Sequence, residues 1–323
     1  MAVSRNSLSP DLPARVGAVL AARLQADERL CVGLSGGCDS VVLLHVLNRL
    51  GYAGRLAAIH VHHGLSPNAD AWAEFCISYC RDLAVPLTVR RVAVDRCTGQ
   101  GLEAAARQAR YAAFAECAAD CLLLAQHRGD QAETVLFNLL RGSGVIGAAA
   151  MPVERQMVGQ RLLRPLLDIS RAEIEDYARA NDLAWVDDES NADTALTRNF
   201  IRHAVLATLN RRFPAAEAAL AQAAANFSEA SGLLDELAGI DWQLAADGEA
   251  ARLSVLRTLS LPRLKNLLRY RLRQLGWRVP VATRLDEFAH QVHTAAPDRH
   301  PELLLPEGTM RCGRGRLQWL PQK

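Results

Sequence analysis

The sequence lacks any apolar run that approaches the about 20 residues needed to cross a bilayer. Half of its 323 residues are apolar and 22% are charged, which is ordinary for a globular protein. The first 16 residues contain neither the apolar core nor the small-residue cleavage site of a secretory signal. We therefore expect a cytoplasmic protein with no membrane partner.

Closely paired cysteines are also missing. The chain has eight cysteines, but no two have the spacing C-x-x-C, and the nearest pairs, Cys76/Cys80 and Cys117/Cys121, are spaced C-x3-C. A disulfide framework is typical of short secreted domains, whereas this chain is long and its cysteines are scattered. The sequence therefore predicts buried free thiols.

Lysine is scarce, since only Lys265 and Lys323 occur and arginine carries nearly all of the positive charge. Residues 1–213 contain 23 basic and 23 acidic side chains, residues 214–250 contain none and seven, and residues 251–323 contain 14 and five. A basic block after a balanced body indicates a polyanion partner, although an arginine-rich solvated surface explains the same counts. We predict three parts with these bounds: a catalytic domain, an acidic helical connector and a small basic domain.

Strand and helix patterns alternate through the first part of the chain. Apolar strands are predicted at 30–34, 55–61, 86–94 and 121–125, and helices at 41–47, 68–83, 101–118 and 130–140. This alternation predicts an α/β fold with a doubly wound, mostly parallel sheet and right-handed crossovers. Ligands of such sheets bind at the carboxyl ends of the strands.

The rest of the chain is mainly helical in pattern. Helices are predicted at 170–181, 197–213, 215–244, 262–275 and 281–293, and short strands joined by glycine turns at 303–320. Ser170 and Glu173 form a capping box at the first of these helices. The last two helices and the strands predict a small α+β domain at the C-terminal end.

A glycine turn joins the first predicted strand to the following helix, with the sequence Ser35-Gly36-Gly37-Cys38-Asp39-Ser40. A helix start offers backbone N–H groups and a positive dipole end, which together hold phosphate. Asp39 repels phosphate unless Mg²⁺ lies between them. The alternative is a plain turn in which serine and aspartate only cap the helix. No lysine follows the glycines, so the turn is not a Walker A loop, and no G-x-G-x-x-G fingerprint occurs.

Histidines gather where the second predicted strand ends, in the sequence His60-Val61-His62-His63-Gly64-Leu65. Alternation places His60 and His62 on one face of the strand. They suit a nucleotide-binding edge around an adenine. A zinc site and a simple capped strand end are the alternatives, and zinc is disfavoured because no cysteine pair lies nearby.

Two acids follow the fourth predicted strand, in the sequence Gln126-His127-Arg128-Gly129-Asp130-Gln131-Ala132-Glu133. Asp130 and Glu133 are spaced i, i+3 at a helix start and share a face. They suit Mg²⁺ or the ammonium group of an amine substrate. The alternative is ordinary helix N-terminal acids favoured by the dipole.

Arginines mark the alanine-rich helix predicted at 101–118. Arg107, Arg110 and Tyr111 follow Glu103 at helical spacing. Arginine is suited to bidentate contact with phosphate, whereas the alternative is helix surface charge.

These segments together resemble the N-type ATP pyrophosphatases, and more narrowly the tRNA(Ile)-lysidine synthetases. Six occur in order: SGGCDS at 35–40, HVHHGLS at 60–66, EAAARQARY at 103–111, AQHRGDQAET at 125–134, RGSG at 141–144 and RPLLDISRAEI at 164–174. The stretches at 187–193 and 198–202 resemble that family's D-x-S/T-N and R-N-x-I-R segments. The resemblance is strong over residues 28–213 and weak over 250–320.

The resemblance implies a Rossmann-like ATP-pyrophosphatase fold and ligation of L-lysine to the C2 position of a wobble cytidine. The tRNA(Ile) would have the anticodon CAU, and ATP would adenylate the cytidine before the lysine amine attacks, with AMP and pyrophosphate as products. It implies Mg²⁺ as a cofactor and the basic block as a tRNA-binding domain. We expect a homodimer as the assembly.

The implied roles fall on the residues already singled out. Catalytic roles fall on Asp39, Asp130 and Glu133, and a Mg²⁺ site on Asp39 and Asp130. The residues implied for ATP binding are Ser35, Gly36, Gly37, Cys38, Asp39, Ser40, His60, His62, Arg110 and His127.

This chain departs from the family pattern at two positions. It has Gly129-Asp130 where members often have two acids or Asn-Asp, which leaves Asp130 as the sole acid of that pair. His62 stands at a position of the H-x-N-H-G pattern that also takes asparagine.

Three other functions are open. Thiolation of tRNA by a related enzyme needs C-x-x-C cysteines, which are absent. A carbon–nitrogen ligase of the amidotransferase type needs a glutaminase Cys-His pair, which is not evident. Against a non-catalytic nucleotide- or RNA-binding module stands the retention of Asp39, Asp130 and Glu133 together.

Overall fold

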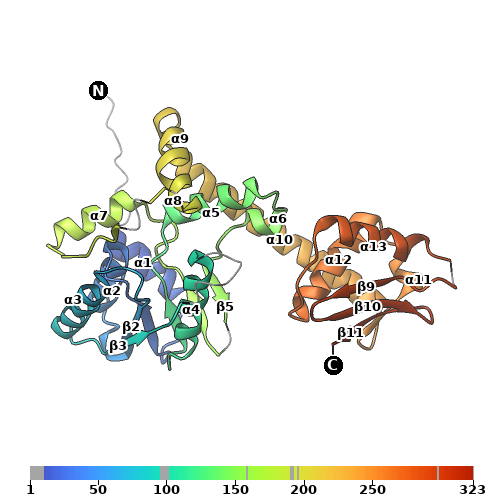
Figure 1. Ribbon diagram of the computed structural model, residues 1–323, viewed down its shortest axis with the longest axis horizontal. Coiled ribbons are helices and arrows are strands. Elements are labelled where there is room, and N and C mark those ends of the chain that lie inside the picture. The colour runs from blue at the N-terminus through green and yellow to red at the C-terminus, as the bar shows by residue number, and fades with distance from the viewer. Residues whose placement is uncertain are drawn as a thin grey trace. The chain divides into compact units, whose positions relative to one another are not determined.

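The computed structural model describes residues 11–94, 102–157, 159–189, 193–194, 196–296 and 298–322. The chain divides into two compact units, Met1–Phe227 and Ser228–Lys323 (Figure 1). The boundary between the units falls inside one long helix, α10 (Ala216–Ala245), which forms from the acidic segment where we predict a helical connector.

The first unit is built on a six-stranded sheet in the order β3-β2-β1-β4-β6-β5. Its strands are β1 (Leu30–Gly33), β2 (Leu56–His62), β3 (Leu87–Arg91), β4 (Cys121–Leu123), β5 (Glu154–Gln156) and β6 (Arg161–Leu163). The first four coincide with the predicted strands, and the pairs among β3, β2, β1, β4 and β6 are parallel. The predicted mostly parallel sheet is therefore confirmed, and β5 adds an antiparallel edge strand.

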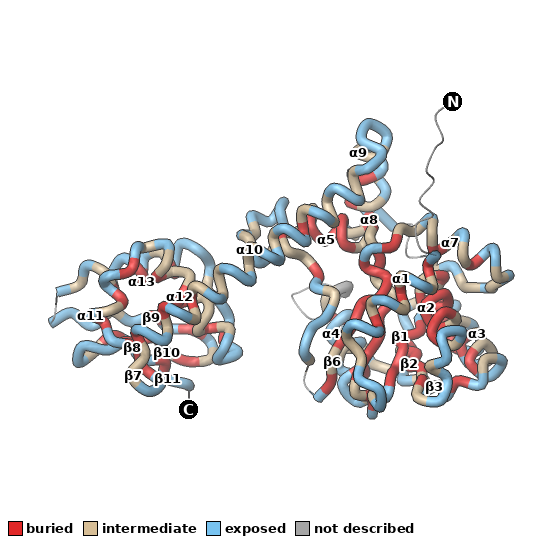
Figure 2. Tube along the Cα trace, turned by 180° about the vertical axis from the view of Figure 1, so that it is seen from behind, coloured by how far each residue is buried: buried red, intermediate tan, exposed pale blue. Residues whose placement is uncertain are grey.

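Alternate residues of the central strands enter two separate cores. Leu30 and Val32 of β1 pack in the cluster that contains α2 and α3, whereas Cys31 packs with Phe114 of α4. The helices concerned are α1 (Leu12–Ala21), α2 (Cys38–Arg49), α3 (Ala69–Asp82), α7 (Arg171–Ala180) and α4 (Leu102–Ala115). Both faces of the sheet are thus covered, which confirms the doubly wound fold. Figure 2 shows buried backbone concentrated along β1, β2 and α2.

A second layer of helices packs beside the sheet. It contains α5 (Arg128–Leu140), α6 (Val145–Ala148), α8 (Thr197–Phe200), a π-helical segment (Ile201–Leu206) and α9 (Ala207–Arg212). Where the sequence predicts one helix over 197–213, the structure therefore has three joined segments. Ala132 of α5 packs against Ile201 and Leu206, so the π-helical segment is held against the start of α5.

The second unit contains an antiparallel sheet in the order β7-β8-β11-β10-β9, with helices against it. The elements are β7 (Ala246–Asp247), β8 (Ala250–Arg252), α11 (Leu253–Leu256), α12 (Leu261–Gln274), α13 (Ala282–Thr294), β9 (Glu302–Leu305), β10 (Gly308–Gly313) and β11 (Arg316–Pro321). Its core includes Leu268, Phe288 and Met310. The predicted small α+β domain is confirmed, with β7 and β8 as additional strands.

Two further features concern the whole described chain. The seven described cysteines are free thiols, and six of them are buried, as predicted. None of the described helices is both long and apolar enough to cross a membrane.

Candidate active site

The turn between β1 and α2 folds tightly over itself. Gly36 has φ +92°, and a Cβ there would lie 2.8 Å from Cγ2 of Val186, so glycine is required at this position. The Val186 N–H donates to the Gly36 carbonyl oxygen (3.0 Å), which fixes the outer side of the turn. The turn is therefore shaped by a segment 150 residues further along the chain, at Val186.

Hydroxyl groups and helix N–H groups face the inside of this turn. The Ser40 hydroxyl donates to the Gly37 carbonyl oxygen (2.9 Å) and lies 3.1 Å from the Ser35 hydroxyl. Cys38 and Asp39 occupy the first two positions of α2, where backbone N–H groups have no partner within the helix. Two serine hydroxyls and a helix N-terminus are the groups that bind a phosphate.

Asp39 lies between a cation and a histidine. Its carboxylate accepts two hydrogen bonds from Arg171 Nη1 (both 2.6 Å), and its Oδ2 lies 4.0 Å from His127 Nε2. The side chain is 26% exposed. Burial raises the pKa of Asp39, against the opposing effect of His127 and Arg171. A desolvated carboxylate at a phosphate-binding turn favours a site over a plain cap.

His127 joins the two predicted clusters. It is the N-cap of α5: its Nδ1 accepts the Gly129 N–H (3.0 Å), so the proton of the neutral ring lies on Nε2. That Nε2 lies 3.7 Å from Asp130 Oδ2 and 4.0 Å from Asp39 Oδ2. The ends of β1 and β4 are thereby brought to one place at the carboxyl edge of the sheet, as predicted for such a fold.

Glu133 and Asp130 share a single cation, Arg202 of the π-helical segment. Arg202 donates to Glu133 Oε1 (2.5 Å) and Oε2 (3.1 Å) and to Asp130 Oδ1 (3.2 Å). The Glu133 side chain is 3% exposed, and burial raises its pKa although Arg202 lowers it. The predicted shared face of the two acids is confirmed by this common partner.

The chemistry of the two aspartates suits a Mg²⁺ ion that would be shared with nucleotide phosphates. In the described part of the chain no three His, Cys, Asp or Glu side chains are grouped to hold a metal by themselves. Mg²⁺ at phosphate-transfer sites needs only one or two protein carboxylates, because phosphates and water supply the other ligands. Asp39 and Asp130 both approach His127 Nε2, and the charge of Asp130 adds to the raised pKa of Asp39. A cation between them would relieve that repulsion.

His60 and His62 lie on one face of β2, as predicted, and both contact the α3 region. His60 Nδ1 bonds to the Leu34 carbonyl oxygen (2.9 Å), and His62 Nε2 to Asp70 Oδ1 (3.1 Å). His60 thus supports the residue before the phosphate-binding turn. The neighbouring His63 has an orphaned buried Nδ1, and burial lowers its pKa to about 4.

Arg110 of α4 reaches the same strand end. Its Nε donates to His63 Nε2 (3.4 Å), which brings the arginine helix to the carboxyl edge of β2. Arg110 was singled out from the sequence, whereas His63 was noted only as part of its motif.

Sequence reasoning missed the two arginines that hold the acids. Arg171 and Arg202 lie in the quoted segments at 164–174 and 198–202, but neither was singled out. The motifs that contain these arginines could be found in the sequence. Their pairing with the acids could not, since each arginine is more than 60 residues from its acid.

Comparisons with known proteins agree with this geometry. Residues 9–209 match a family model described as a PP-loop domain, and residues 252–318 match one described as the TilS substrate binding domain. A tRNA(Ile)-lysidine synthase of Nitrosomonas europaea is 44% identical over 307 residues, which cover 94% of this chain and 67% of that protein. The one of Aromatoleum aromaticum is 46% identical over 310 residues, 94% of this chain and 72% of that protein.

A solved structure shares the fold. The U34-tRNA thiolase NcsA from Methanococcus maripaludis, solved with its [4Fe-4S] cluster, superposes with a TM-score of 0.56 at 18% identity, covering 68% of this chain and 78% of the thiolase. That likeness concerns the fold alone. The sequence identities and the two family models, in contrast, are specific: the chain belongs to the tRNA(Ile)-lysidine synthase family of PP-loop enzymes.

Proposed function

We propose that this chain uses ATP to ligate L-lysine to C2 of the wobble cytidine in a tRNA(Ile) with a CAU anticodon, yielding lysidine, AMP and pyrophosphate. The observation that carries the proposal is the convergence of Asp39, His127, Asp130 and Glu133 at one edge of the sheet, beside a phosphate-binding turn. Family membership supplies the substrates.

The first step is adenylation of the cytidine. The cytidine O2 attacks the α-phosphorus of ATP, and the bond to pyrophosphate breaks. The N–H groups at the start of α2 and the hydroxyls of Ser35 and Ser40 bind the departing phosphates. We place Asp39 and Asp130 as the residues that would hold Mg²⁺, which neutralises phosphate charge when bound. The Nε2 of His127 lies within 4.0 Å of one oxygen of each carboxylate.

The second step is attack by the lysine amine. The neutral ε-nitrogen bonds to C2, gives up a proton, and AMP leaves with the former O2 oxygen. Glu133 and Asp130 supply the negative charge that binds the ammonium group and receives its proton. Both acids are already paired with Arg202, so the amine binds there only when Arg202 shares them or moves away.

The remaining parts of the proposal concern binding and assembly. The basic segment 251–323, with 14 basic and five acidic side chains, is proposed to bind the tRNA backbone. The domain bounds, the homodimer and the cytoplasmic location stay predictions. Light scattering of the purified protein tests the homodimer.

The deciding experiment is mass analysis of the wobble cytidine after incubation with ATP, Mg²⁺, lysine and tRNA. We expect the mass of lysidine, with pyrophosphate released only when tRNA is present. Omission of lysine is the control, and it should abolish the new nucleoside. Incorporation of sulfur, or pyrophosphate release that does not depend on tRNA, would contradict the proposal.

A further inference from the structure

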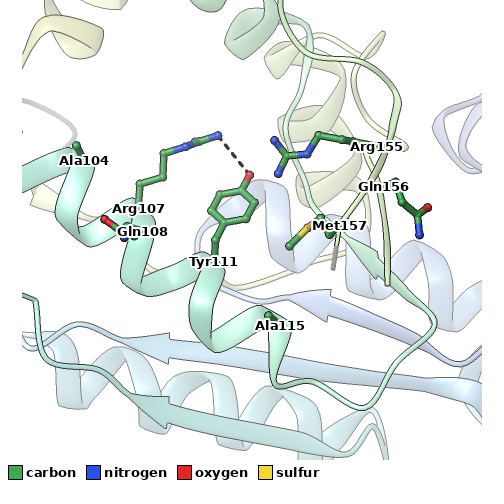
Figure 3. A pocket seen from close by; sticks show the side chains of 8 residues that line it. All are labelled: Ala104, Arg107, Gln108, Tyr111, Ala115, Arg155, Gln156 and Met157. Carbon is green, nitrogen blue, oxygen red and sulfur yellow. Dashed lines mark hydrogen bonds between the residues drawn. The ribbon is translucent and has the colours of Figure 1, made fainter. Parts of the chain in front are cut away.

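A hollow of about 780 Å³ lies between α4 and β5, apart from the phosphate-binding turn. Figure 3 shows the side chains that line it. They are Ala104, Arg107, Gln108, Tyr111, Ala115, Arg155, Gln156 and Met157. None of these eight described residues is acidic, and two are arginines. The lining of the hollow is therefore positively charged.

The two arginines converge on one tyrosine. Arg107 Nη2 donates to the Tyr111 hydroxyl (3.3 Å), and its guanidinium carbon lies 4.9 Å from the centre of the Tyr111 ring. The guanidinium carbon of Arg155 lies 5.4 Å from the same ring. In Figure 3 the two guanidinium groups approach the hydroxyl from opposite sides. Two like charges at one hydroxyl repel each other unless an anion joins them.

A third arginine lies behind them. Arg164 follows the last residue of β6 and is only 2% exposed. Its Nη1 donates to the Pro152 carbonyl oxygen (2.7 Å) and its Nε to Gln126 Oε1 (3.0 Å), which are neutral acceptors. Burial lowers the pKa of Arg164, and the charges of Arg155 and Arg107 lower it further, whereas Tyr111 opposes them. Because these oxygens carry no charge, the positive charge of Arg164 is not neutralised by them and can attract an anion.

The hollow is linked to the reacting edge through the neighbours of its lining residues. Gln126, the partner of Arg164, immediately precedes His127. Arg110, which precedes Tyr111 on α4, contacts His63 at the end of β2. An anion in the hollow would therefore lie on the face of the sheet that α4 covers.

We propose that this hollow binds a backbone phosphodiester of the RNA substrate, with Arg107 and Arg155 as its charged contacts and Tyr111 as a hydroxyl donor. The inference rests on the proposed function in taking tRNA as the substrate. Nucleotide triphosphate is the other source of the same chemistry, but the start of α2 already provides its site. The Tyr111 ring and Met157 also offer apolar surface for a base, which a single phosphate ion would not use.

The test is Arg155→Ala, since Arg155 is exposed and its loss should leave the fold intact. Affinity for a tRNA transcript is measured by fluorescence anisotropy at several salt concentrations. Loss of one phosphate contact should lower the salt slope by roughly one. The fall in affinity between about 50 and 200 mM salt should therefore shrink roughly threefold. Arg81→Ala, an exposed arginine on α3, is the matched control and should bind as wild type.

Two further measurements separate the alternatives. Tyr111→Phe keeps the ring and removes the hydroxyl, and it should weaken tRNA binding without changing the salt slope. The KM for ATP should be unchanged in both variants. An unaltered tRNA affinity and slope in Arg155→Ala would overturn the inference, as would a raised KM for ATP alone. Wild-type protein that binds tRNA in this way but forms no lysidine would overturn the proposed function only.

Discussion

Two acidic residues at the carboxyl edge of the sheet are half-buried or buried although burial disfavours their charged form. Asp39 and Glu133 are desolvated carboxylates whose pKa values are raised, although each is bonded to an arginine. Such groups reduce stability and are retained where a substrate or a cation needs charge. The same two positions, viewed in the sequence alone, are indistinguishable from ordinary acids in the first turn of a helix. Burial distinguishes these functional acids from ordinary acids in the first turn of a helix.

The first prediction concerns Asp39→Asn. The amide keeps the shape and loses the charge that would hold Mg²⁺ against the phosphates, so lysidine formation should fall by about 100-fold or more. Far-UV circular dichroism and the unfolding temperature should stay near wild type. Asp176→Asn, which changes an exposed acid on α7, is the matched control and should retain full turnover. Unchanged kinetics in Asp39→Asn would remove this residue from the mechanism.

The second prediction concerns Glu133→Gln and pH. Because the pKa of Glu133 is raised above its ordinary value of 4.5, the folded protein binds this proton more tightly than the unfolded chain does. Stability from this group is then full below about pH 4.5 and is lost as pH rises through the folded pKa. At pH 8 the variant should unfold at the same or a higher temperature, within about 4 °C, while lysidine formation is lost.

Thermal unfolding at pH 5 and pH 8 checks this prediction. Any advantage of Glu133→Gln should be larger at pH 8 than at pH 5. A variant that is destabilised more at pH 8 than at pH 5 would show that the ion pair with Arg202 outweighs the burial of the carboxylate.

Helices and strands differ in how far their own residues specify them. The capping box of α7 was predicted and is present, with the Ser170 N–H donating to Glu173 Oε2 (2.8 Å). The cap of α5 was not, because histidine is not among the preferred N-cap residues and its ring packs where a side chain of Gly129 would lie. The three-residue strands β5 and β6 carry too little pattern to stand out. Helix α1 does carry a pattern, since Asp11 caps it and Leu12, Val16 and Leu20 recur at helical spacing, and sequence reasoning missed it.

The site was predictable only in the part that the order of the strands determines. The order of strand ends places residues 35–40 and 126–133 at one edge, and topology alone gives that result. The arginines that complete the site come from α7 and from the π-helical segment, whose wide turn has no sequence signature. Pairings across such sequence separations depend on tertiary packing.

The third prediction uses the cap of α5 to separate structure from chemistry. His127→Ala removes the acceptor for the Gly129 N–H and should cost about 1 kcal/mol of stability. His127→Asn restores a capping oxygen, so it should recover that stability. It cannot place a ring nitrogen between Asp39 and Asp130, so its lysidine formation should stay low. Denaturant unfolding and turnover of both variants check this, and full activity in His127→Asn would reduce His127 to a cap.

The two units of the chain differ in net charge, and each has a hydrophobic core of its own. The first holds the phosphate-binding turn and has equal numbers of basic and acidic side chains over residues 1–213, whereas the basic block lies within the second. Each has its own buried cluster. The acidic segment between them forms α10, which contributes to both: Leu220 packs against the π-helical segment, and Ala245 and Trp242 join the second core.

The fourth prediction follows from where α10 changes partners. A chain that ends after Phe227 should keep the first unit folded, because Leu220 and the buried Ala224 remain. Ending the chain at residue 250 would instead leave Trp242 and Ala245 without their core, and would favour aggregation. The shorter protein should bind tRNA about tenfold more weakly or worse, with a salt slope reduced by several contacts.

Anisotropy with a tRNA transcript measures this effect, and the unfolding temperature of the shortened protein shows whether the first unit is intact. Residual tRNA binding should remain and should still respond to Arg155→Ala, because the hollow between α4 and β5 is in the first unit. An intact shortened protein with the wild-type salt slope would mean that the 14 basic residues of 251–323 form a solvated surface. The arginines of this segment would then only replace lysines at the surface, because the chain has just two lysines. The excess of basic side chains in residues 251–323 would then be no evidence for a polyanion partner.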